Sequence, residues 1–183
     1  CDYPLAQAVE DRIVKAPLVV KGVDEPGPAG VTKKNVLDKY EPWLKAGLSR
    51  FHEHEKAYKA LPGVRPVMFV MTENISHADA IGEWFIEQPG VKDEHVLVIH
   101  TDSEGQIRKG ELDELRDQAR RIDEPASPVR IVVSVLVLRE GWDVRNVTMV
   151  LGLRPGNAAA GILPEQAVGR GLNPKPLPES GAE

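Results

Sequence analysis

The chain has 183 residues, of which 42% are hydrophobic and 28% are charged, and its formal net charge at pH 7 is −5. These values are ordinary for a globular protein with one main domain, and they argue against a disordered chain or two large domains. The negative charge also argues against a broad basic surface that binds nucleic acid nonspecifically, so any such contact must be local.

The single cysteine, Cys1, cannot form an internal disulfide or a thiolate metal cluster, which favours a reducing compartment, the cytoplasm. No apolar run reaches the ~18 residues of a membrane span, and we expect neither a signal peptide nor a membrane partner. The first residues, CDYPLAQAVEDRIVKAP, lack an initiator Met and start in the middle of a pattern. We therefore expect the chain to be a piece of a longer protein.

The N-terminal third combines a loop with one long helical pattern. Residues 22–30, GVDEPGPAG, carry too many Gly and Pro for a helix or a strand, which predicts a loop. From Thr32 to about Leu61, apolar residues recur at steps of three and four, which predicts an amphipathic helix. Pro42 lies inside this pattern and predicts a break, because proline removes a backbone donor.

The rest of the chain alternates between apolar runs and helical patterns. Four apolar runs are candidates for buried strands: residues 66–71, 95–100, 129–137 and 147–153. The helical patterns between them are residues 77–88, for which Ser76 is a candidate N-cap, and the charged residues 110–123. This alternation predicts the α/β class, with a parallel β-sheet flanked by helices.

Two polar segments stand where a ligand would bind such a sheet. REGWD, residues 139–143, follows the third strand, and ligands gather beyond the C-terminal strand ends of parallel sheets. The last helical pattern is LPEQAVGRGLN, whose Gln166, Arg170 and Asn173 share one polar face. The glycines beside Arg170 let another surface approach the backbone. This face is a candidate ligand site.

The residue patterns of these segments resemble the motifs of a known family. GWD after a strand, then LGLRP and EQAVGRG, resemble motifs V and VI of superfamily 2 helicases, closest to the Res (R) subunit of type III restriction enzymes. FVMTENISHADAIGEWF resembles the motif IV region, and VLVIHTDSEGQIRKGELDELR the strand, loop and helix after it. YPLAQAVEDRIVKAPLVVKG resembles the segment that leads into the second motor lobe, so the likeness runs from about Tyr3 to Leu172.

The resemblance implies the second RecA-like lobe of a two-lobed, P-loop NTPase-type motor, spanning residues 63–176. Residues 1–62 would be a leading segment packed on the lobe, and residues 177–183 a tail. ATP with Mg²⁺ would bind between this lobe and a preceding one, since the chain has no GxxxxGK[ST] motif and no DEAH-like motif after a strand. The chain alone is therefore expected not to hydrolyse ATP.

The resemblance also assigns roles at the nucleotide. Arg170 matches the first arginine of motif VI, whose guanidinium can neutralise charge on the transferred phosphoryl group, an effect worth ~10³–10⁵ in rate. Gln166 matches the motif VI glutamine and would orient nucleotide or arginine. Gly141, Asp143 and Gly169 would bind nucleotide: the glycines let the backbone approach, and Asp143 can accept from a ribose hydroxyl or pair with a basic residue of motif VI.

Nucleic-acid contact is implied at the first strand. Thr72, Asn74 and Ser76 match the region that contacts the nucleic-acid backbone, where helix N-terminal amides favour phosphate. The implied partners are double-stranded DNA, an N-terminal RecA-like lobe of the same parent protein and a modification (methyltransferase) subunit. No nuclease motif is visible, so nuclease chemistry is expected elsewhere in the parent.

One departure from the family motif leaves the function open. The pattern GRGLR carries a second arginine, but this chain has Asn173 there, followed by Pro174, Lys175 and Pro176. Either residues are missing before this tail, or the motor is weakened, or Lys175 substitutes poorly. A non-catalytic helicase-like module that binds nucleic acid or protein is therefore the alternative to a motor lobe, and an unrelated nucleotide-binding α/β domain is the third hypothesis.

Simpler roles compete at individual positions. Asp143 can cap the turn after the third strand, and Arg170 can be an ordinary surface arginine. Trp142 is expected to pack beneath its loop. The five histidines are spaced poorly for a shared metal, so no metal site is expected on this chain.

Overall fold

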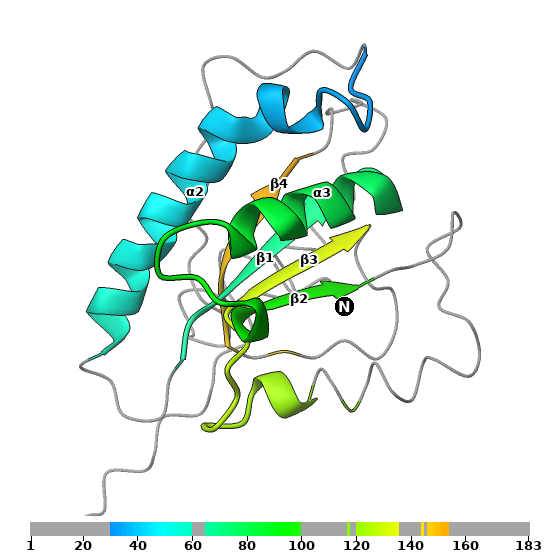
Figure 1. The fold of residues 1–183 in the computed structure, drawn as a ribbon. Coiled ribbons are helices and arrows are strands. Elements are labelled where there is room, and N and C mark those ends of the chain that lie inside the picture. The colour runs from blue at the N-terminus through cyan, green and yellow to red at the C-terminus, as the bar shows by residue number, and fades with distance from the viewer. Residues whose placement is uncertain are drawn as a thin grey trace, which may run out of the picture.

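The computed structural model describes residues 30–59, 65–99, 117, 120–135, 144 and 146–153. The described chain runs from one long helix into strands separated by further helical segments (Figure 1). The elements in chain order are α2 (Val36–Tyr58), β1 (Val67–Thr72), α3 (Ile75–Ile86), the 3₁₀ helix η1 (Asp93–His95), β2 (Val96–Ile99), β3 (Ile131–Val135) and β4 (Val147–Gly152).

The strands form a sheet of four with the order β2-β3-β1-β4, and every pair is parallel. Phe69 at the middle of β1 pairs with Val132 of β3 on one side and Val150 of β4 on the other. The sheet and its helices confirm the predicted α/β class and are consistent with a RecA-like lobe. Because the strands are parallel, their carboxyl ends lie at one edge.

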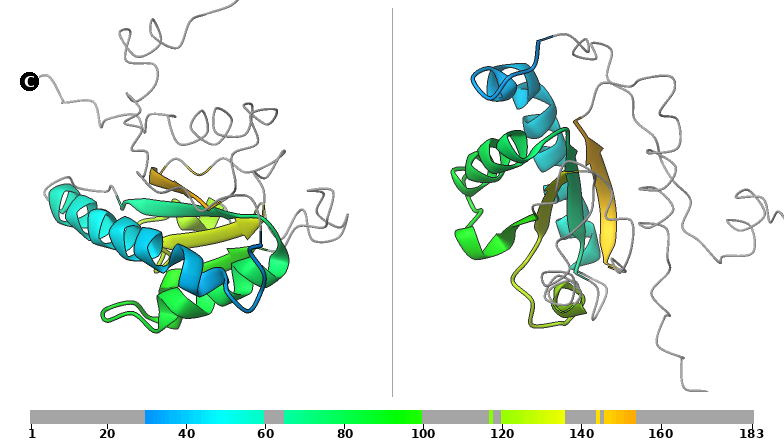
Figure 2. Two further views of the ribbon diagram at one scale, coloured as in Figure 1. Left: turned by 90° about the horizontal axis from the view of Figure 1, so that it is seen from above. Right: turned by 90° about the vertical axis from the view of Figure 1, so that its right-hand side faces the viewer.

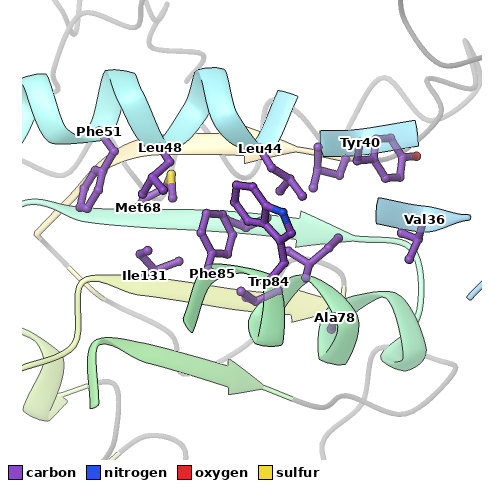
Figure 3. Close-up of a cluster of buried hydrophobic side chains, with 14 of the residues drawn as sticks. Val36, Tyr40, Leu44, Leu48, Phe51, Met68, Ala78, Trp84, Phe85 and Ile131 are labelled. Atoms are coloured by element: carbon purple, nitrogen blue, oxygen red, sulfur yellow. The ribbon is translucent and has the colours of Figure 1, made fainter. Parts of the chain in front are cut away.

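The two faces of the sheet carry separate hydrophobic clusters, as the two-residue period of a strand requires. On β1, Met68 and Val70 belong to the cluster under α2 and α3, whereas Val67 and Phe69 belong to the cluster on the opposite face. Figure 2 shows α2 and α3 on the same side of the sheet, and Figure 3 shows the side chains between them. The opposite face packs against Ile122 among others.

α2 is held by its apolar side chains. Tyr40, Leu44, Leu48 and Phe51 recur at helical spacing and are buried against the sheet and α3 (Figure 3). α2 shares one hydrophobic cluster with β1, so the described residues before and after residue 62 contribute to the same core.

The predicted break at Pro42 is wrong, since α2 continues through this residue. Proline in a helix costs about 3 kcal/mol, partly because it offers no N–H to the carbonyl of Asp38. Pro42 is exposed, and the residues buried on the opposite side of α2 each contribute about 1.5–3 kcal/mol, which offsets that cost.

The four predicted strands are all present, with ends that differ by up to two residues: β1 is shifted by one residue, from 66–71 to Val67–Thr72. The expected run at residues 95–100 begins at Val96, because His95 belongs to η1, and the run at 129–137 begins at Ile131. The expected helix at residues 110–123 lies largely outside the described residues, which are helical at 117 and 120–122. No helix in the described ranges has both the length and the apolar character to cross a membrane.

Candidate nucleic-acid interface

Three adjacent strands end together at the carboxyl edge of the sheet. Thr72, the last residue of β1, pairs with Val135, the last residue of β3. Met71 pairs with Gly152 at the end of β4, and the Met71 carbonyl accepts a hydrogen bond from the Leu153 N–H at 2.9 Å. The segments that follow β1, β3 and β4 therefore all leave from one edge, with β1 in the middle.

Thr72, which was expected to contact nucleic acid, is buried at the carboxyl edge of the sheet. Thr72 is 1% exposed, and its Oγ1 is 3.3 Å from the Ser134 carbonyl oxygen and 3.4 Å from the Asn74 carbonyl oxygen. Both distances are long for a hydroxyl donor, in keeping with one proton shared between two acceptors. The hydroxyl of Thr72 thus faces the protein backbone.

Asn74 caps α3. Its backbone is extended, with φ −153° and ψ 168°, and its Oδ1 accepts from the His77 N–H at 3.0 Å and from the Ser76 hydroxyl at 2.8 Å. The predicted cap at Ser76 is wrong, and the helix begins at Ile75. Asparagine is as good an N-cap as serine, so composition alone did not separate the two positions.

The buried side chain of His77 lies against the inner side of this turn. It is 2% exposed, and its ring nitrogens lie 3.3 and 3.4 Å from the Asn74 Nδ2. Burial lowers the pKa of His77, and the nearby Glu73 carboxylate opposes that effect. The imidazole is therefore held neutral near pH 7, a state in which one ring nitrogen can accept from the Asn74 amide. The sequence pattern gave no reason to connect His77 with Asn74.

The outer side of the turn offers hydrogen-bond donors. Asn74 and Ile75 are exposed and Ser76 is half-buried. Within the described part of the chain, the amides of Ile75 and Ser76 have no acceptor, as is usual for the first turn of a helix. These amides, with the positive end of the helix dipole, favour an anionic group such as a phosphate.

Glu73 limits the positive character of this turn. The residue is exposed next to Asn74, and its carboxylate adds to the effect of burial in raising the pKa of Tyr40 on α2. A phosphate beside the turn would be attracted by the helix end and repelled by Glu73. The arrangement suits a weak, reversible contact.

The predicted nucleotide-binding half lies outside the described residues: Gly141, Asp143, Gln166, Gly169 and Arg170. In sequence, the GWD segment follows the end of β3 and the EQAVGRG segment follows the end of β4. Among the residues that the structure describes, no cluster of three or more His, Cys, Asp or Glu could hold a metal ion.

No protein-family model matches the chain, and no curated protein matches it.

Proposed function

We propose that this chain is the C-terminal motor lobe of an ATP-dependent DNA helicase or translocase of the type III restriction class. The observation that carries the proposal is the order β3-β1-β4 at the carboxyl edge. The central strand leads into the turn with Asn74 and Ser76, and its two neighbours lead into the segments that resemble motifs V and VI. Adjacent strand ends would bring these three segments toward one site, as a shared nucleotide and DNA site requires, and this supports the proposal.

In this proposal, the turn after β1 contacts the DNA backbone. Phosphate oxygens accept hydrogen bonds from the Ile75 and Ser76 amides and from the Asn74 side-chain amide. Such contacts do not depend on the base sequence of the DNA. Glu73 keeps the contact weak, so that the lobe can release and bind again as it moves. The DNA partner and the single cysteine make the cytoplasm the proposed compartment.

The nucleotide half of the proposal rests on sequence. Gly141, Asp143 and Gly169 would hold ATP against a preceding lobe, which would also supply the ligands of Mg²⁺. Gln166 would orient the nucleotide, and Arg170 would stabilise charge on the phosphoryl group during transfer. ATP hydrolysis, when the two lobes are joined, would supply the free energy that alternates the grip on DNA. A methyltransferase subunit is the further partner that this class implies.

The test is ATP hydrolysis, with and without duplex DNA, by the polypeptide that carries both lobes. Arg170→Ala is expected to lower kcat by ~10³–10⁵. The matched control is Arg121→Ala, which removes an exposed arginine and is expected to leave turnover unchanged. Equal turnover in wild type and Arg170→Ala would remove the proposed role of Arg170.

The second candidate is a helicase-like module that binds DNA without hydrolysing ATP. Asn173 favours it, since this position carries the second arginine in the family pattern. DNA binding without turnover in the two-lobed polypeptide would support this module over the motor. If Asn173→Arg then restored turnover, the missing guanidinium would be the reason for the lost activity.

A further inference from the structure

The hydroxyl of Thr72 lies between two parts of the carboxyl edge that have different proposed functions. It is within hydrogen-bond distance of the Asn74 carbonyl, in the turn proposed to contact DNA, and of the Ser134 carbonyl, on β3. Thr72 is 1% exposed, so neither solvent nor DNA reaches this hydroxyl without a local opening. The hydroxyl has one proton and two backbone acceptors.

We infer that Thr72 is a positioning residue that couples the DNA-contacting turn to β3, and does not itself contact DNA. This inference rests on the proposed function, because it assumes that the turn of Asn74 and Ser76 binds a phosphate backbone. β3 ends at Val135 and continues in sequence toward Gly141 and Asp143. A change in the turn therefore reaches the strand that leads to the proposed nucleotide-binding segment.

The physical basis is the shared proton. When a phosphate binds the Ser76 and Ile75 amides, the turn adjusts and the Asn74 carbonyl shifts relative to Thr72. A three-centre hydrogen bond then redistributes toward one acceptor, which changes the electron density at the Ser134 carbonyl. The amide that follows that carbonyl is the one of Val135, so its chemical shift reports the change directly.

The experiment is a titration of the whole 183-residue chain, labelled with ¹⁵N, with a short duplex DNA of mixed sequence. In the wild type, the amides of Ile75 and Ser76 are expected to shift, and those of Ser134 and Val135 to shift with them. In Thr72→Val, which keeps the shape of the side chain and removes the hydroxyl, the shifts at Ile75 and Ser76 remain. Those at Ser134 and Val135 are lost.

The affinity and the matched variant complete the test. Losing one hydrogen bond that orders the turn is expected to weaken DNA binding about fivefold, or ~1 kcal/mol, in Thr72→Val. Thr72→Ser keeps the hydroxyl and is expected to restore both the affinity and the shift at Val135. A general loss of structure would not be corrected selectively in this way, and thermal unfolding of both variants checks for it.

Different outcomes separate the inference from the function beneath it. If the turn shifts and Val135 shifts equally in wild type and Thr72→Val, the coupling through Thr72 is wrong. The same conclusion follows if the wild-type turn shifts while Ser134 and Val135 do not, and this arm decides even if Thr72→Val does not fold. If DNA moves no amide of the wild-type turn, the proposed DNA contact itself fails.

Discussion

The sheet has an amino edge, where its parallel strands begin, and a carboxyl edge, where they end. These two edges are held together in different ways. At the amino edge, side chains join distant segments: Arg130 Nη1 lies 2.9 Å from Glu55 Oε1, and Arg65 Nη1 donates to the Ser127 carbonyl at 3.0 Å. At the carboxyl edge, Thr72 Oγ1 also reaches the Ser134 carbonyl across 62 residues, but among the described residues the side chain of Asn74 bonds to neighbours within three residues.

This difference separates a structural edge from a binding edge. The amino edge uses its charged groups to hold strands and α2 in place, across 62 and 75 residues of sequence. The carboxyl edge has one buried hydroxyl link to β3, from Thr72, and a turn held by local bonds, whose Ile75 and Ser76 amides have no acceptor among the described residues. Substitutions at the two edges should therefore separate stability from DNA affinity.

The largest effect is expected from loosening α3, because it packs across the sheet and begins at the carboxyl edge. Phe85 is fully buried in the cluster between α3, α2 and the sheet (Figure 3). Phe85→Ala is expected to lower the free energy of unfolding by about 3–5 kcal/mol, measured by urea denaturation. The control Ile75→Ala removes a side chain that is 42% exposed and should change stability by less than about 0.5 kcal/mol. Equal destabilisation by both variants would contradict the packing.

Asn74 tests whether capping and DNA contact can be separated. Asn74→Ala removes the acceptor for the His77 N–H and should cost about 1 kcal/mol of stability. Asn74→Ser keeps an oxygen acceptor for the His77 N–H and so should keep the capping contribution to stability, but it lacks the side-chain amide, which also faces the buried His77 ring. DNA affinity, measured by fluorescence anisotropy, should fall about fivefold in Asn74→Ser, from the loss of one hydrogen bond. Wild-type affinity in Asn74→Ser would show that the amide does not contact DNA.

The amino edge should respond in the opposite sense. Glu55→Gln and Arg130→Gln each remove one charge of a partly exposed pair and should cost about 0.2–1 kcal/mol of stability. Neither should change DNA affinity at constant salt, because the pair lies at the other edge of the sheet. A loss of affinity comparable with that of Asn74→Ser would remove the distinction between the edges.

The smallest effect is a pH dependence that both edges share. Burial lowers the pKa of His77 at the carboxyl edge and of His95 at the amino edge, where Arg130 lowers the pKa further. The unfolded chain therefore binds protons first, so stability should fall as the pH drops below the ordinary value of 6.5. Urea midpoints between about pH 5 and 7.5 should depend less on pH in His77→Gln and in His95→Gln. Unchanged slopes in both variants would contradict the burial of the imidazoles.

The fold followed from patterns that the sequence shows directly. Apolar runs such as VMFVMT on β1 are buried on both faces of a parallel sheet, so they can be recognised without knowing their neighbours. The predicted break at Pro42 is wrong because the sequence shows the local cost of a proline in a helix but not the burial of Tyr40 and Leu44, which is a tertiary effect. The start of α3 was misplaced because Asn74 and Ser76 are both good N-caps.

The site was harder to predict because it depends on which way a side chain faces. Thr72 stands in a motif-like segment, and only the position of the Ser134 carbonyl on a strand 62 residues away reveals that its hydroxyl points inward. His77 carries no sequence signal for its contact with Asn74, since that contact requires the helix start to be known.

A DNA titration of the wild-type chain, followed amide by amide, tests the central claim most directly. The account predicts that the amides of Ile75 and Ser76 shift on adding duplex DNA, whereas those of His95 and Arg130 at the amino edge do not. Shifts confined to the amino edge, or no shifts at saturating DNA, would contradict a DNA-binding turn at the end of β1.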